Sequence, residues 1–373
     1  MTKRVYLHIG LPKTGTTYLQ DSLWAQRAEL RRRGLLIPGR HRRRHLLASF
    51  EVREDPSLAR RPGDVTRPWG ELVEEILASE SDALVSHEFF SAAGVPQIQR
   101  VLDDLPGREV QVVITARALA EIGLSMWQES VKNGSAIALE KFPAPDSYRP
   151  TGVWGWAGID LADVLTRWSA VIEPERIHVL PMRSSDDPAL LWRRYLEVLG
   201  VDPEGLPPAE QPANESLGLV EIELLRRINP QLRDFKASYA RGTWIRGYLA
   251  HGAVMPRSRE KFTASMAKLA EFDERGQSAV ELLRTGGYDV RGELDWLRPG
   301  DFSSRRRPED VTDAELLDAS TQLVAGMLGD VRRLTGEVKT LGKQAATASP
   351  NAANPKAAEP AAEPAGRRWR RRK

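Results

Sequence analysis

The chain of 373 residues contains no cysteine. This absence excludes disulfide bonds, thiolate metal sites and cysteine nucleophiles, and it agrees with a reducing compartment. Long apolar runs are also missing. The N-terminus, Met1–Arg4, leads directly into a short apolar segment, and no stretch has the length of a signal-peptide hydrophobic region or a membrane span. We therefore expect a cytoplasmic protein.

The chain also has little net charge, because 54 basic residues are offset by 51 acidic ones to give +3. Nucleic-acid-binding proteins usually carry a basic surface of one sign, so no nucleic-acid partner is expected. Hydrophobic residues make up 41% of the chain, an ordinary value for a soluble globular protein that buries a full core.

Short apolar or β-branched runs alternate with helical patterns as far as Gly200. The predicted strands are Val5–Ile9, Leu35–Ile37, Asp82–Ser86, Val110–Thr115 and Ile177–Pro181. One continuous helix is predicted over Thr16–Arg33. Such alternation is typical of a mostly parallel sheet covered by helices on both faces, so the fold class is α/β. Beyond Gly200 the pattern predicts helices and no further strand.

The composition predicts three parts. Residues 1–305 form the main domain. Residues 309–343 form a helical C-terminal extension with coiled-coil character, and residues 344–373 form a disordered tail with a basic end. The tail is rich in Ala, Pro, Glu and Asn, which cannot bury a core.

The segment Gly10–Thr17 follows the first predicted strand and opens the first predicted helix. In that position, backbone N–H groups and the positive end of the helix can bind an anion. Gly10 and Gly15 permit a tight turn. The hydroxyls of Thr16 and Thr17 can donate hydrogen bonds to phosphate oxygens. The sequence therefore predicts a phosphate-binding loop.

The spacing is close to the nucleotide-binding pattern G-x-x-x-x-G-K-[ST] but departs from it in two ways. Thr16 stands where that pattern has lysine, and the one lysine of the loop is Lys13. The strand Val110–Thr115 is followed by Arg117 and lacks the carboxylate that holds magnesium in nucleoside triphosphatases. We therefore expect an anion-binding loop that uses no metal.

Residues 7–20, LHIGLPKTGTTYLQ, resemble the 5′-phosphosulfate-binding loop of the sulfotransferase superfamily, in particular a bacterial branch. The resemblance implies a P-loop-like fold and the donor 3′-phosphoadenosine-5′-phosphosulfate (PAPS). It implies that Lys13 contacts the oxygen that bridges phosphorus and sulfur, where charge develops during transfer. The residues implied in donor binding here are Gly10, Lys13, Thr14, Gly15, Thr16 and Thr17.

The same family holds the 3′-phosphate of PAPS with an arginine at a strand end and a serine eight residues later. Arg117 and Ser125 have this spacing, and arginine binds phosphate in a bidentate manner. The resemblance extends over about residues 1–300 but is only pattern-level after Ser125. The R-x-G loop of the cytosolic eukaryotic branch has no clear match, with Arg241-Gly242 and Arg246-Gly247 as weak candidates.

A catalytic base is expected at Ser86-His87-Glu88, where a predicted strand ends. The family uses Glu in some branches and His in others. The Ser-x-Glu pattern of bacterial relatives favours Glu88, and His87 stays the alternative. Neighbouring residues on an extended strand point in opposite directions, so only one of the two should face the site. As a base, Glu88 would need a pKa raised by burial.

Together these features favour transfer of a sulfuryl group from PAPS to a hydroxyl or an amine. Two alternatives stay open, a nucleotide kinase or triphosphatase and a non-catalytic nucleotide-binding protein. The acceptor cannot be identified from sequence, and a saccharide, a glycolipid or a secondary metabolite all fit. The expected acceptor loops are 40–66 and 134–158, with His41, His45 and Trp24 as further candidates.

The segment Leu317–Leu341 carries apolar residues at heptad spacing. One series is Leu317, Val324, Val331 and Val338, and the other is Ser320, Met327, Leu334 and Leu341. This pattern favours a two-stranded parallel coiled coil and hence a homodimer. The alternative is a single amphipathic helix docked on the main domain. The tail Arg367–Lys373 suits either weak contact with an anionic membrane or solvent exposure.

Overall fold

The computed structural model describes residues 2–61, 63–144, 153–183, 185–210, 216–235 and 237–348. The chain divides into two compact units, Met1–Ser320 and Thr321–Lys373. Residues 349–373, which include the basic end of the predicted tail, lie outside the described residues.

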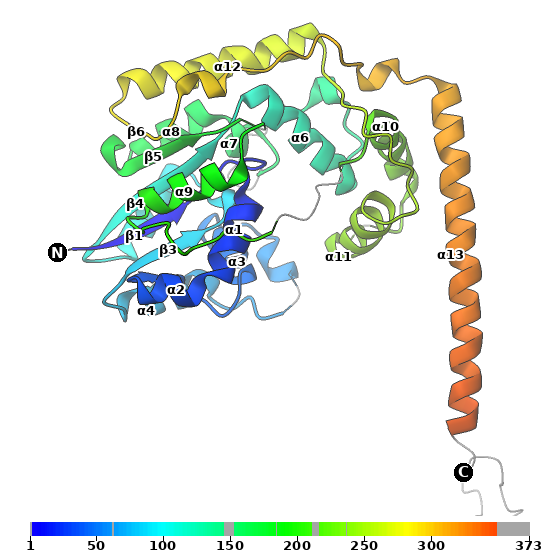
Figure 1. Cartoon of the computed structure of the whole chain (residues 1–373), viewed down its shortest axis with the longest axis horizontal. Helices are drawn as coiled ribbons and strands as arrows, with labels where there is room; N and C mark the ends of the chain where they lie inside the picture. Colours follow the sequence, from blue (N-terminus) through cyan, green and yellow to red (C-terminus); the bar gives the residue numbers. More distant parts are fainter. Residues whose placement is uncertain are drawn as a thin grey trace, which may run out of the picture. The chain divides into compact units, whose positions relative to one another are not determined.

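The first unit is built on a six-stranded sheet in which every pair of neighbouring strands is parallel (Figure 1). The strand order is β2-β3-β1-β4-β5-β6. The strands are β1 (Lys3–His8), β2 (Leu35–Leu36), β3 (Asp82–Ser86), β4 (Arg108–Ala116), β5 (Ile177–Pro181) and β6 (Asp289–Val290). The prediction of an α/β fold with a parallel sheet is confirmed.

The prediction of no strand after Gly200 is wrong, because β6 pairs with β5 through His178–Asp289 and Val179–Val290. A strand of two residues is too short to show the alternation of apolar and polar residues by which strands are predicted. Pairing with β5 defines this strand, and a side-chain contact supports it: Nδ1 of His178 lies 2.6 Å from Oδ2 of Asp289.

The helices are α1 (Thr16–Ala25), α2 (Arg27–Arg32), α3 (Arg43–Val52), α4 (Pro68–Leu77), α5 (Val95–Asp103), α6 (Leu119–Lys132), α7 (Trp156–Ile159), α8 (Leu161–Ser169), α9 (Pro188–Val198), α10 (Leu219–Ile228), α11 (Ser238–Ala240), α12 (Met266–Thr285) and α13 (Asp313–Ala348). The prediction of one helix over Thr16–Arg33 is wrong, because the chain breaks at Gln26. The predicted loop 40–66 is wrong in part, since it contains α3. Part of the other predicted loop, residues 145–152, lies outside the described residues.

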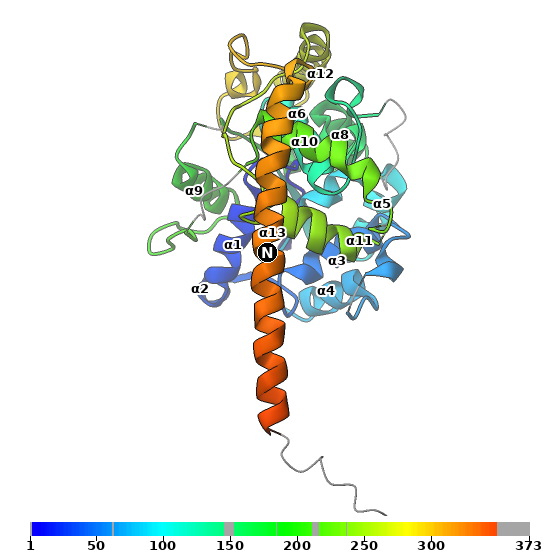
Figure 2. The ribbon, with the colours of Figure 1, turned by 90° about the vertical axis from the view of Figure 1, so that its right-hand side faces the viewer.

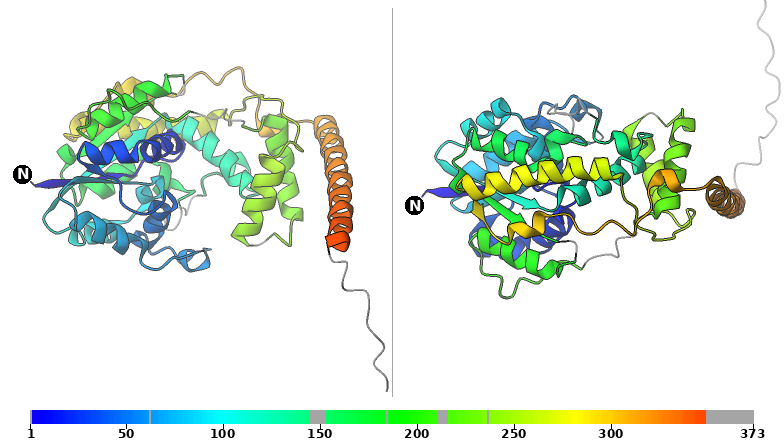
Figure 3. Two further views of the ribbon diagram at one scale, coloured as in Figure 1. Left: turned by 60° about the horizontal axis from the view of Figure 1, so that its bottom comes forward. Right: turned by 90° about the horizontal axis from the view of Figure 1, so that it is seen from above.

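Helices cover both faces of the sheet. Helices α1, α2 and α9 pack on one face, where they contact Tyr6, Leu84, Val113 and Leu180. The strand residues that alternate with these are also buried, as a parallel sheet covered on both faces requires. Figures 2 and 3 show the helices on both sides.

The strand register decides where the functional groups lie. His8 of β1 is level with Ser86 of β3 and with Val113 of β4. The residues that follow these strands therefore gather at the carboxyl edge of the sheet, where open parallel sheets bind ligands. The loop after β1, the pair His87–Glu88 and Arg117 all lie at this edge.

Helix α13 is continuous over its 36 residues (Figure 2). The predicted helix in this region is confirmed. The helix also includes residues 344–348, which the sequence assigned to the disordered tail. Along the second unit, the apolar side chains of the predicted heptads are exposed, with Val331 at 59% and Leu341 at 63%. No described helix is long and apolar enough to cross a membrane.

Candidate functional site

The loop Gly10–Thr17 is a tight turn with three residues in the left-handed region. The φ angles are +52° at Gly10, +65° at Lys13 and +79° at Gly15. A Cβ atom at Gly10 would lie 2.5 Å from Cγ2 of Thr16 and 3.2 Å from Cβ of Glu88, so this position requires glycine. Lys13 adopts a conformation that costs free energy for a non-glycine residue, an arrangement that is common at binding sites.

Hydrogen bonds hold the loop against the neighbouring strand. The backbone N–H of Leu11 donates to the carbonyl of Thr115 at 2.8 Å. The buried hydroxyl of Thr14 donates to the carbonyl of Leu11 and lies 2.7 Å from Oγ1 of Thr115. The Thr14 hydroxyl is thus occupied by hydrogen bonds within the protein, and the backbone N–H of Thr14 is the group that can donate to a ligand. Thr16 is buried and Thr17 is exposed.

The side chain of His8, at the end of β1, contacts residues of β3 and β4 next to this loop. Its Nδ1 lies 2.8 Å from Oγ of Ser86, and its Nε2 lies 3.4 Å from Oγ1 of Thr115. Burial lowers the pKa of His8 to about 3, so the ring is neutral at physiological pH. This side chain packs inside the sheet.

Arg117 and Ser125 lie together, as the family resemblance implied. Nη2 of Arg117 donates to Oγ of Ser125 at 3.2 Å. The Arg117 side chain is only 14% exposed, and its Nε lies 3.1 Å from a carboxylate oxygen of Glu121. Burial lowers the pKa of Arg117 and Glu121 raises it, but arginine stays charged at any physiological pH. The sequence analysis missed Glu121, although its position four residues after Arg117 is a signal for an ion pair.

His87 and Glu88 lie at the end of β3, where the sequence predicts that only one of them faces the site. Strand β3 ends at Ser86, and a short 3₁₀ turn, η2 (Glu88–Ala92), follows at once. Strand alternation therefore no longer applies, and Nδ1 of His87 lies 3.8 Å from Oε2 of Glu88. Oε2 of Glu88 also accepts a hydrogen bond from Nε2 of Gln20 at 3.1 Å. Glu88 is the one that approaches the loop, through Gly10.

The electrostatics of this pair differ from the expected raised pKa of a base. Burial raises the pKa of Glu88, but His87, a backbone hydrogen bond, Gln20 and His8 outweigh burial and hold it below the ordinary value. Burial lowers the pKa of His87, and Glu88 opposes that effect. Nδ1 of His87 accepts the backbone N–H of Phe89 at 3.2 Å. Because a neutral ring has one N–H, the proton of His87 is then on Nε2.

One carboxylate at the loop was missed by the sequence analysis. Oε2 of Glu129, on α6, lies 3.5 Å from Nζ of Lys13, and its Oε1 lies 2.6 Å from Nη1 of Arg246. Glu129 is one helical turn beyond Ser125, so the two face the same side of α6. That spacing was the available signal. The contacts with Lys13 and Arg246 are long-range and leave no mark in the sequence.

The remaining candidates are structural. His45 is buried: its Nε2 lies 2.9 Å from the carbonyl of Pro38, and its Nδ1 accepts the backbone N–H of Ser86 at 3.1 Å. Burial lowers the pKa of His45 to about 4. Trp24 packs against this ring and is partly buried. The weak candidates Arg241-Gly242 and Arg246-Gly247 lie within a π-helix, η6 (Arg241–Ala250), and do not form a loop.

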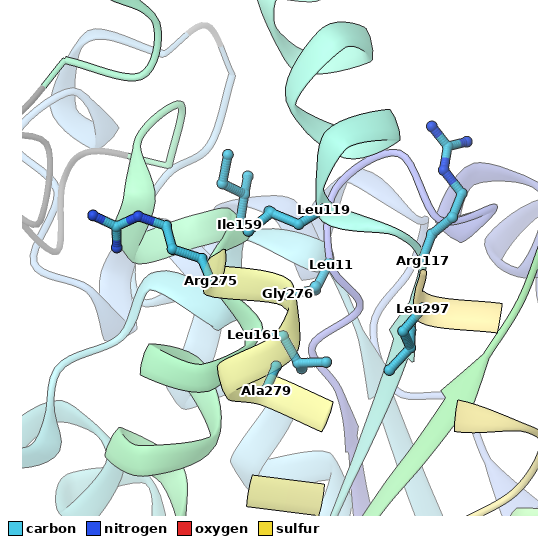
Figure 4. Close-up of a pocket in the computed structure, with 9 residues that line it drawn as sticks. All are labelled: Leu11, Arg117, Leu119, Ile159, Leu161, Arg275, Gly276, Ala279 and Leu297. Carbon is cyan, nitrogen blue, oxygen red and sulfur yellow. The ribbon is translucent and has the colours of Figure 1, made fainter. Parts of the chain in front are cut away.

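A small pocket is lined by Leu11 of the loop and by residues of α6, α8 and α12. Its lining is mostly aliphatic, and the guanidinium groups of Arg117 and Arg275 point away from each other (Figure 4). Lys13 and Glu88 do not line it. Within the described part of the chain, no three His, Asp or Glu side chains are grouped so that they could hold a metal ion.

Comparisons of the chain with protein-family models, with curated proteins and with solved structures find no match. The chemistry of the site is therefore argued from its own residues. These are a glycine loop with an exposed lysine, a partly buried Arg–Ser pair after the next strand and a carboxylate beside the loop.

Proposed function

We propose that this chain is a PAPS-dependent sulfotransferase with a P-loop-like fold. It transfers the sulfuryl group of PAPS to a hydroxyl or an amine of an acceptor. One observation carries the proposal: the loop Gly10–Thr17 and the contact between Arg117 and Ser125, 3.2 Å long, follow the adjacent parallel strands β1 and β4. Two anion-binding groups at neighbouring strand ends suit a donor with two separate phosphates.

Each group has a distinct part in donor binding. The backbone N–H groups of the loop and the N-terminus of α1 would hold the 5′-phosphosulfate. Arg117 and Ser125 would hold the 3′-phosphate, with the arginine already oriented by Glu121. Lys13 would stabilise the negative charge that develops on the leaving phosphate oxygen.

Glu88 is the better candidate for the residue that accepts the proton of the acceptor. It lies against Gly10 of the loop, and its carboxylate is ionised at neutral pH because its pKa is held low. His87 is less suitable, because Nδ1 is engaged by Phe89 and Nε2 carries the proton. His87 would instead help to orient the Glu88 carboxylate.

Two other function classes use the same kind of sheet, namely nucleotide kinases or triphosphatases and non-catalytic nucleotide-binding proteins. Thr16 at the position of the nucleotide-binding lysine disfavours the first class. The combination of Lys13, Arg117, Ser125 and Glu88 disfavours the second, since a binding protein needs no lysine at the bridging oxygen and no base.

The first experiment compares thermal stabilisation of the protein by adenosine 3′,5′-bisphosphate and by ATP with magnesium. A ligand at 100 times its Kd stabilises the folded state by about 2.7 kcal/mol. We expect stabilisation by the bisphosphate and little by ATP with magnesium, and the reverse result would favour the kinase. Incubation with labelled PAPS and extracts of the source cell, followed by mass spectrometry, then identifies the sulfated product.

A further inference from the structure

A cluster of positive side chains surrounds Glu129 at the C-terminal half of α6. Its members are Lys13 of the loop, Lys132 of α6 and Arg246 of η6, here called the α6 cation cluster. Lys13 and Arg246 share the Glu129 carboxylate, at 3.5 Å and 2.6 Å. The charge of Glu129 also acts on Lys132, so three cations are set against one carboxylate, which leaves an excess of positive charge beside the loop.

Lys132 is the unusual member of the cluster. It is only 5% exposed, and the negative charge of Glu129 favours the charged form of its ammonium group. Lysine is rarely buried, because taking an ammonium group out of water is costly unless opposite charge compensates it. Burial lowers the pKa of Lys132 to about 8; Glu129 opposes that effect, and the charges of Lys13, Arg246 and Arg257 add to it.

The fold holds η6 close to α6 so that the cluster persists. Gly134, just beyond the end of α6, has a φ of +95°, and a Cβ atom there would lie 2.9 Å from Cδ of Arg241. Ile245, next to Arg246, is buried. The ten-residue π-helix is itself uncommon, and π-helical turns occur often at functional sites.

The cluster is separate from the groups that would hold the donor's 3′-phosphate. Ser125 lies one turn earlier on α6, and Arg117 is already balanced by Glu121. Lys13 is the link between the two regions, since it lies in the donor loop and pairs with Glu129. The excess positive charge therefore adjoins the place where the sulfuryl group would be transferred.

We propose that the α6 cation cluster binds an anionic group of the acceptor, a carboxylate, sulfate or phosphate that the acceptor carries before transfer. This inference rests on the proposed function and names its substrate class. An anion seated there would pair with Lys132 and Arg246 and balance the excess charge. Glu129 keeps Lys13 and Arg246 in position but disfavours an anion close to its own carboxylate. Lys132 is then the principal contact.

The first test measures anion binding without any acceptor. Melting temperatures are recorded in sodium sulfate and in sodium chloride of equal ionic strength, with saturating adenosine 3′,5′-bisphosphate to occupy the donor site. We expect an extra stabilisation by sulfate in the wild type that is lost in Lys132→Met and reduced in Arg246→Gln. The matched control, Lys339→Met on the exposed surface of α13, should keep it.

The Lys132 variants should fold, because removing a buried ammonium group should raise the melting temperature in chloride. If Lys132→Met and Arg246→Gln both keep the full sulfate effect, the cluster does not bind anions and the proposal is overturned. Should the bisphosphate fail to bind while the sulfate effect persists, the proposed donor is wrong and the anion site stands.

The second test identifies the charge of the acceptor. A cell extract is separated on an anion-exchange column, and the neutral flow-through and the retained fraction are each assayed with labelled PAPS. We expect acceptor activity in the retained fraction, with kcat/KM lowered at least tenfold in Lys132→Gln, mainly through KM, and unchanged in Lys339→Gln. Acceptor activity confined to the neutral flow-through would overturn the proposal.

Discussion

In a folded protein charged side chains usually lie outside and large apolar side chains inside, and the two units depart from this arrangement in different ways. In the first unit charged groups are buried, as Glu129 and Lys132 are beside the loop. In the second unit large apolar groups are exposed, as Val331 and Leu341 are on α13. Buried charges and exposed apolar surfaces are the informative exceptions in a folded protein. We propose that each reflects a partner, an anion for the first unit and another apolar surface for the second.

The largest expected effect tests Glu88, a partly buried residue whose Cβ approaches Gly10 of the loop. Glu88→Gln keeps the shape of the side chain but cannot accept a proton, so turnover should fall by about 10²–10⁴-fold. Binding of adenosine 3′,5′-bisphosphate, measured by calorimetry, should be nearly unchanged. His87→Ala is the comparison variant and should lose less turnover. The opposite ranking would transfer the role of base to His87.

Lys13→Ala tests the exposed cation of the loop. Losing one electrostatic stabiliser of a transition state typically costs about 10²–10³-fold in turnover, and we expect a loss of this size with a modest change in donor affinity. Steady-state rates with labelled PAPS measure the first, and calorimetry measures the second. Lys339→Ala, on the exposed surface of α13, is the control. Turnover within a few-fold of the wild type would exclude the assigned role.

Arg117→Ala tests the balanced charge pair at the start of α6. We expect PAPS and adenosine 3′,5′-bisphosphate to bind at least tenfold more weakly, in line with about 1.5–3 kcal/mol for a charged hydrogen bond. Adenosine 5′-phosphosulfate has no 3′-phosphate and should bind nearly as before. Calorimetric titrations of the three ligands decide the matter, and equal weakening of all three means that Arg117 has another role.

How far the sequence predicted this site depends on the range of each contact. The tight turn of the loop was predictable because its geometry is local, whereas the pair of Arg117 and Ser125 was predicted only through the family resemblance. The pair of Lys13 and Glu129 was not, because it joins segments more than a hundred residues apart. The interpretation of His87 and Glu88 relied on strand alternation, which does not apply to them because β3 ends at Ser86.

The exposed heptads of α13 lead to the next prediction, and we propose that they pair two copies of the chain. Gly326, Gly329 and Gly336 lie off the two apolar series, so the seam is continuous although each glycine weakens the helix. Val331→Glu should convert a dimer to a monomer in light scattering, because it places like charges in the seam. Gln322→Glu, off the seam, is the control.

A monomeric wild-type chain in the same measurement would refute the pairing. The structure also corrects the design of a truncated monomer. A cut after Pro308 would remove Val311, Leu316 and Ala319, which are buried. A cut after Ser320, where the first unit ends, keeps these residues and should leave an active, folded monomer.

The smallest expected effect is the pH dependence of stability that arises from Lys132. Its pKa in the folded protein is about 8 instead of its ordinary 10.5, mainly because of burial. Between pH 8 and pH 10.5 the ammonium group is protonated in the unfolded chain and largely neutral in the folded one. The free energy of unfolding therefore rises as the pH increases from about 8 to 10.5, and this gain is lost when the pH falls back through 8. Urea unfolding of the wild type and Lys132→Met at pH 7.5 and pH 10 isolates the effect. From pH 7.5 to pH 10 the free energy of unfolding should increase more in the wild type than in Lys132→Met. Lys339→Met should show the same pH dependence as the wild type. Saturating sulfate should reduce the difference, because an anion beside the ammonium group favours its charged form. Equal pH dependence in both proteins would mean that Lys132 is solvated, and the contrast between buried charge in the first unit and exposed apolar surface in the second would then rest on Glu129 alone.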